Sequence, residues 1–132
     1  MSGREGAEGP APRKPSTHAA GAAAEEVAAR AMEAAGWTVV ARNWRAVPGE
    51  LDIVARKGEE LAFVEVKSVD AYGPESAERL VDARKRRRVV ETSQFFLAAN
   101  REYKRMSLRY DVILIRAGRL ERWLERAFPE RA

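Results

Sequence analysis

The sequence contains no cysteine, which excludes disulfide bonds, thiolate-bound zinc and a cysteine nucleophile. Its one histidine, His18, lies in a polar, proline-rich stretch where a solvated side chain is expected rather than a catalytic one. No apolar run approaches the roughly 20 residues that a membrane-spanning helix needs. Charged residues interrupt the alanine-rich stretch 19–35, unlike the core of a signal peptide. We therefore expect a cytoplasmic protein with no membrane contact.

The length and composition favour one compact domain. The chain has 132 residues, of which 45% are hydrophobic, enough for a core of modest size. Residues 1–18 are rich in glycine, proline and serine and show no hydrophobic periodicity, which predicts a disordered tail. The remaining residues, 19–132, are expected to form the domain.

Positive charge is concentrated in one segment. Between residues 79 and 109 there are ten lysines and arginines but three acids, so this segment carries +7 and the rest of the chain −3. Such asymmetry fits a surface that binds an anionic polymer, although a solvated arginine-rich helix face has the same composition. On a helix the cations at 84–88 cannot all point the same way, so two or three of them are expected to reach phosphates.

The hydrophobic pattern predicts a mixed α/β fold. Strong helix formers precede Gly36, and short segments rich in β-branched residues alternate with turn residues further along. We expect helices over 19–35 and 82–101, strands over 37–43, 50–57, 60–67 and 108–116, and a terminal strand or helix over 120–128. This order suggests a mixed β-sheet flanked by helices.

Acidic side chains occupy two neighbouring predicted strands. Gly58-Glu59 suits the centre of a two-residue hairpin turn, which would place Asp52 opposite Glu65 and Glu50 opposite Lys67. Directly opposed residues have Cβ atoms about 4.5–5.5 Å apart, so the two carboxylates would repel each other.

Three arrangements could offset this repulsion. One carboxyl could stay protonated with a raised pKa, Lys67 could neutralise the pair, or a divalent cation could bind both. An ordinary cross-strand lattice of ion pairs among Glu50, Asp52 and Lys67 explains the same pattern. The otherwise apolar run 61–66 favours a site, because charges at the end of an inner strand are costly unless they are paired or bound to metal.

Asp52 followed by Glu65-Val66-Lys67 resembles the bipartite motif of the PD-(D/E)XK nuclease superfamily. Within it, the chain is most similar to the YraN family of small bacterial nuclease-like proteins, over residues 20–128. The ordered set that carries the resemblance is Glu25, Arg42-Asn43-Trp44-Arg45, Gly49-Glu50-Leu51-Asp52, Phe63-Val64-Glu65-Val66-Lys67, Tyr72-Gly73, the Lys85 region, Arg109-Tyr110-Asp111-Val112 and Ala127-Phe128.

The resemblance implies a restriction-endonuclease-like core of αβββαβ order and a Mg²⁺- or Mn²⁺-dependent endonuclease. Asp52 and Glu65 would be metal ligands, joined by the backbone carbonyl of Val66 and by Glu25. Lys67 would position the attacking water. DNA, including branched or repair intermediates, would be the substrate, and a homodimer is compatible with the resemblance because related resolvases are often dimers.

We also expect four residues outside the motif to bind nucleic acid. They are Arg84, Lys85 and Arg88 in the basic segment and Tyr72 in the loop after the motif strand. A non-catalytic nucleic-acid-binding module of the same fold is the alternative to an enzyme. A protein-interaction domain with an acidic partner is a third reading.

Overall fold

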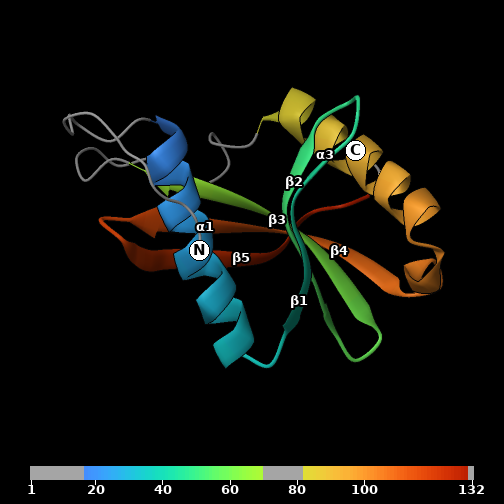
Figure 1. Ribbon diagram of the computed structural model, residues 1–132, viewed down its shortest axis with the longest axis horizontal. Helices are drawn as coiled ribbons and strands as arrows, with labels where there is room; N and C mark the ends of the chain where they lie inside the picture. The colour runs from blue at the N-terminus through green and yellow to red at the C-terminus, as the bar shows by residue number, and fades with distance from the viewer. Residues whose placement is uncertain (1–16, 70–81, 131–132) are drawn as a thin grey trace, which may run out of the picture.

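A computed structural model describes residues 17–69 and 82–130. Two long helices lie on either side of a twisted sheet (Figure 1). The elements, in chain order, are α1 (Thr17–Ala34), β1 (Thr38–Arg45), β2 (Glu50–Lys57), β3 (Glu60–Val69), α3 (Ala83–Ala99), the short 3-10 helix η1 (Arg101–Tyr103), β4 (Ser107–Arg116) and β5 (Arg119–Phe128).

The five strands follow one another across the sheet in the order β1-β2-β3-β4-β5. All neighbours are antiparallel except β3 and β4, which run parallel. Parallel neighbours cannot be joined by a tight turn, so the chain leaves β3, crosses one face of the sheet with α3 and returns to β4. This crossover carries the basic segment over the strands that hold the acidic motif.

Each face of the sheet has its own core. On one face, alanines 24, 28 and 29 and Met32 of α1 pack against Ile53, Val64 and Ile113, and the small side chains let the helix approach closely. On the other face α3 contributes Val89 and Phe96. Phe96 meets Trp44 and Phe63 edge-on, with ring centroids 5.3 and 5.9 Å apart.

The expected fold class is confirmed, because the chain forms a mixed α/β structure consistent with a restriction-endonuclease-like core. The terminal element is a strand, β5. Helix α1 begins at Thr17, two residues before the expected start of the domain, and the rest of the predicted tail lies outside the described residues. None of the helices that the structure describes is long and apolar enough to cross a bilayer.

Asp111 forms a buried polar centre between β4 and β5. Its carboxylate is fully buried and accepts hydrogen bonds from Nη2 of Arg109 (2.8 Å), Nε1 of Trp123 (2.9 Å) and the backbone N–H of Arg126 (3.0 Å). The guanidinium of Arg109 in turn lies 4.6 Å from the ring centroid of Trp37. With donors on every side, Asp111 is a structural residue that ties β5 and the start of β1 to the sheet.

We expect Asp111→Ala to lower the free energy of unfolding by about 3–5 kcal/mol, because it removes the buried partner of the Arg109 charge. Urea denaturation measures the change. Glu125→Gln is the matched control: Glu125 contacts the same arginine at 3.2 Å but its side chain is 63% exposed, so a loss below about 1 kcal/mol is expected. Equal losses in the two variants would contradict the structural role of Asp111.

Candidate active site

The predicted hairpin brings Asp52 and Glu65 together. Gly58 takes a φ of 60°, and β2 pairs with β3 in the predicted register from Lys57–Glu60 to Ile53–Val64. The pairing of β2 with β3 ends at Ile53, so Asp52 lies just beyond the last paired residue of β2. There the carboxylate of Asp52 accepts a hydrogen bond from the backbone N–H of Val66 (2.8 Å), which fixes it against β3.

The environment of Asp52 disfavours a charged carboxylate. Burial, with the nearby charge of Glu65 as the second cause, raises the pKa of Asp52 to about 7, although the Val66 N–H acts in the opposite direction. Glu65 itself is 5% exposed. Burial also raises the pKa of Glu25 on α1, partly offset by a hydrogen bond with Asn43, and Glu25 adds to the negative potential at Asp52. A carboxyl with a raised pKa is one of the three arrangements that the sequence left open, and the surroundings of Asp52 favour it.

The cation that neutralises Glu65 comes from α3. Nζ of Lys85 lies 3.1 Å from Oε2 of Glu65, whose side chain is 6% exposed. Asp82 caps the helix by accepting a hydrogen bond from the Lys85 backbone N–H (2.9 Å), which fixes the first turn. In the described part of the chain, Lys85 makes the ion pair with Glu65, whereas the sequence had offered Lys67 as one of three ways to offset the repulsion.

A pocket of about 250 Å³ lies where these groups meet. Its walls combine two strands, the turn between β1 and β2, and α3. The lining residues are Pro48, Gly49, Glu50, Asp52, Glu65, Lys85, Arg88 and Val89. Three carboxylates and two cations, drawn from separate segments of the sequence, therefore line one small cavity.

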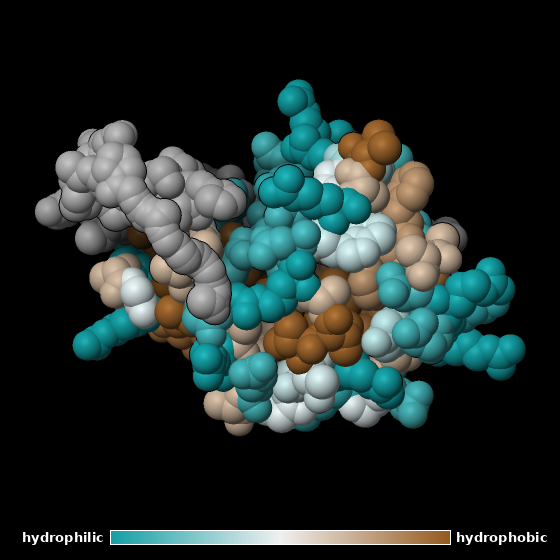
Figure 2. Space-filling model, in the orientation of Figure 1, coloured by the Kyte–Doolittle hydropathy of each residue, from teal (hydrophilic) through white to brown (hydrophobic). Residues whose placement is uncertain are grey.

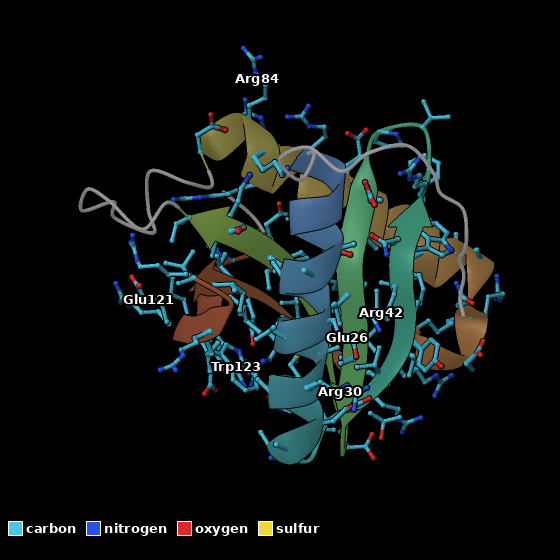
Figure 3. The ribbon with its side chains drawn as sticks, turned by 60° about the vertical axis from the view of Figure 1, so that its left-hand side comes forward. Glu26, Arg30, Arg42, Arg84, Glu121 and Trp123 are labelled. Carbon is cyan, nitrogen blue, oxygen red and sulfur yellow. The ribbon has the colours of Figure 1, made fainter. Side chains whose placement is uncertain are left out.

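The pocket does not include every predicted site residue. Neither Lys67 nor Glu25 is among its lining residues. Arg84 is exposed and extends away from the start of α3 (Figure 3), where the surrounding surface is largely hydrophilic (Figure 2). Tyr72 lies outside the described residues, so its expected role stays a prediction.

Carboxylate oxygens are suitable ligands for a hard divalent cation, but the site offers few of them. In the described ranges 17–69 and 82–130, no three aspartate, glutamate or histidine side chains are grouped so that they could hold a metal ion. Mg²⁺, however, commonly binds protein through one or two carboxylates and takes its other oxygens from water and substrate phosphate. The repulsive, desolvated pair of Asp52 and Glu65 fits that mode of binding.

Two residues that the sequence placed only within the family-like stretches make contacts at the site that were not expected. Gly49 lies against α3, where a Cβ would be 3.2 Å from Oγ1 of Thr92 and 3.5 Å from Cδ of Arg88. Asn43, with a positive φ of 52°, hydrogen-bonds Glu25. The Pro48-Gly49 pair signalled only a turn in the sequence, and neither contact follows from local periodicity.

The model of Uncharacterised protein family UPF0102 matches residues 24–115. The chain belongs to the UPF0102 family. This confirms the resemblance to the YraN family, and the nuclease-like superfamily is consistent with it. The match spans both acidic strands, α3 and most of β4.

Several UPF0102 proteins are similar over most of their length. One from Azorhizobium caulinodans is 43% identical over 117 residues, which cover 88% of this chain and 87% of the relative. Another, from Treponema pallidum, is 39% identical over 102 residues, 77% of this chain and 81% of the relative. A third, from Bradyrhizobium diazoefficiens, is 36% identical over 117 residues, 89% of this chain and 86% of the relative. The family name states no activity.

The pKa of Asp52 predicts how stability depends on pH. The folded-state pKa of about 7 lies above the ordinary value of 3.8, so between these values the native state holds a proton that the unfolded chain has released. Stability therefore falls as pH rises from about 4 to about 7, and levels off above that. We expect Asp52→Asn to remove this loss. Its free energy of unfolding should exceed that of the wild type by about 2–4 kcal/mol at pH 8, and the two values should be equal near pH 4.

Urea unfolding at a series of pH values, in buffer with EDTA, measures this effect. Glu33→Gln is the control, because Glu33 is exposed near the end of α1 and its replacement should keep the wild-type pH profile. Parallel profiles for wild type and Asp52→Asn would show that Asp52 is not the group that titrates.

Proposed function

We propose that this protein is a divalent-metal-dependent endonuclease that acts on DNA in the cytoplasm. The observation that carries the proposal is the pocket in which Asp52 and Glu65 face Lys85 and Arg88. A phosphodiester is an anion, and its hydrolysis develops further negative charge. Acidic groups for a metal and basic groups for a phosphate in one cavity are what this chemistry needs.

The carboxylates of Asp52 and Glu65 would hold Mg²⁺ or Mn²⁺, with the carbonyl of Val66 as a further oxygen ligand, while Glu25, which does not line the pocket, would act through its negative charge. When bound, such an ion supplies Lewis acidity and lowers the pKa of a coordinated water. A cation would also relieve the repulsion that raises the pKa of Asp52, so binding would shift this carboxyl to its charged form.

The basic residues act on the substrate. Arg88 and Lys85 line the pocket, and a guanidinium and an ammonium there would bind the non-bridging phosphate oxygens. Lys67 follows Glu65 by two residues on β3 and is half-buried, and we assign to it the positioning of the attacking water. Arg84, exposed at the start of the helix, would contact a neighbouring backbone phosphate.

Cleavage of linear, flapped and four-way DNA in Mn²⁺ tests the proposal directly. We expect nicking by the wild type and its loss in Asp52→Asn and Glu65→Gln. Lys67→Ala and Lys85→Ala, compared side by side, separate water positioning from phosphate binding: the first should lower kcat at unchanged KM, and the second should raise KM. The metal concentration should be one that raises the melting temperature of the protein. If the wild-type protein leaves the DNA intact under these conditions, catalysis is refuted.

DNA affinity should depend on salt and on the cations of α3. Replacing Arg84 and Arg88 by alanine should reduce the slope of log K against log salt by about 2, because each phosphate contact contributes about 0.9. Arg122→Ala, which removes an exposed arginine on β5, is the matched control and should keep the wild-type slope. Titration of a labelled duplex at several salt concentrations gives these slopes. An unchanged slope in the double variant would exclude this helix as the phosphate-binding surface.

A non-catalytic DNA-binding module is the second candidate. It is favoured by the ion pair of Lys85 with Glu65, which already neutralises one of the carboxylates. It is also favoured because no three acidic side chains of the described residues are grouped so that they could hold a metal ion. Salt-sensitive DNA binding without cleavage would support this candidate.

A further inference from the structure

The turn between β1 and β2 presents a bare hydrophobic side chain. Val47 is 99% exposed, whereas the other exposed large hydrophobic residues of the described ranges, Phe95 and Leu120, are 48% and 42% exposed. Two-residue hairpin loops favour glycine, asparagine or aspartate at their centre. Neither the turn nor the core therefore accounts for valine at this tip.

The tip is held in place from two sides. The backbone N–H of Ala46 donates to the carbonyl of Gly49 (2.9 Å), and the N–H of Gly49 donates back to Ala46 (3.1 Å). Gly49 is also seated against α3, where a Cβ would be only 3.2 Å from Oγ1 of Thr92. Val47 is consequently presented on a supported hairpin and not on a loose loop.

The same turn forms part of the candidate pocket. Pro48 and Gly49 line it together with Lys85 and Arg88, and Val47 directly precedes Pro48 in the chain. Figure 1 shows the β1–β2 hairpin rising beside the first turns of α3. An extended anion bound by the two cations would run past this apolar tip.

We propose that Val47, supported by Pro48, is a wedge that enters an open base step of DNA bound at this pocket. The inference rests on the proposed function and adds a residue that would distinguish branched DNA from a continuous duplex. Proteins insert apolar side chains between bases at the cost of a few kcal/mol of unstacking. This cost is smallest where the step is already open, as at a flap, a bulge or a four-way branch. The wedge would therefore select branched DNA over a continuous duplex.

The test compares Val47→Thr with wild type on a four-way DNA and on a linear duplex of the same arm sequence. Threonine keeps the shape of valine but adds a hydroxyl that is costly to bury between bases. We expect affinity for the branched DNA to fall about five- to tenfold and affinity for the duplex to stay within about twofold. A 2-aminopurine at the branch should show a fluorescence increase on binding wild type and a smaller one with the variant.

Leu120→Thr is the matched control, since it makes an exposed residue of β5 polar at another edge of the sheet, and it should behave as wild type. Unchanged branch affinity and 2-aminopurine signal in Val47→Thr, with salt-sensitive binding that still depends on Arg88, would overturn the wedge alone. Absence of DNA binding by the wild type would overturn the wedge and the proposed function together.

Discussion

The carboxylate of Asp52 is held where water is scarce and a second carboxylate is close, and the site is built around this electrostatic constraint. The fold supplies two compensations, the hydrogen bond from the Val66 N–H and the ion pair of Lys85 with Glu65. They do not cancel the cost, because the pKa of Asp52 remains near 7. A carboxylate in such surroundings is stabilised when it binds a cation or a proton, so its environment favours ligand binding.

Asp111 shows what a fully compensated aspartate looks like in the same sheet. It receives hydrogen bonds from Arg109, Trp123 and the backbone of Arg126. Within the described residues, Asp52 receives one, from Val66, while the charges of Glu65, Glu25 and Glu50 oppose its ionisation. Burial alone does not distinguish a structural acid from a functional one. The number of donors and the sign of the neighbouring charges do.

The crossover from β3 to β4 gives the site its positive side. Because these strands are parallel, the connection must cross the sheet, and it lays the basic helix over the acidic strands. The β1–β2 turn approaches the same helix because Gly49 has no side chain to keep it away. The crossover and the close approach at Gly49 together set the acidic pair, the cations and the β1–β2 turn around one cavity.

Local chemistry in the sequence determined the helices, the strands and the hairpin at Gly58-Glu59. The hairpin register placed Asp52 beside Glu65, since turn length and strand alternation are properties of neighbouring residues. Only the tertiary structure decided that Lys85 is the counterion of Glu65 and that Lys67 and Glu25 do not line the pocket. Those outcomes depend on how α1 and α3 pack on the sheet. Packing of this kind is set by side-chain volume and close approach between distant segments, which no local pattern encodes.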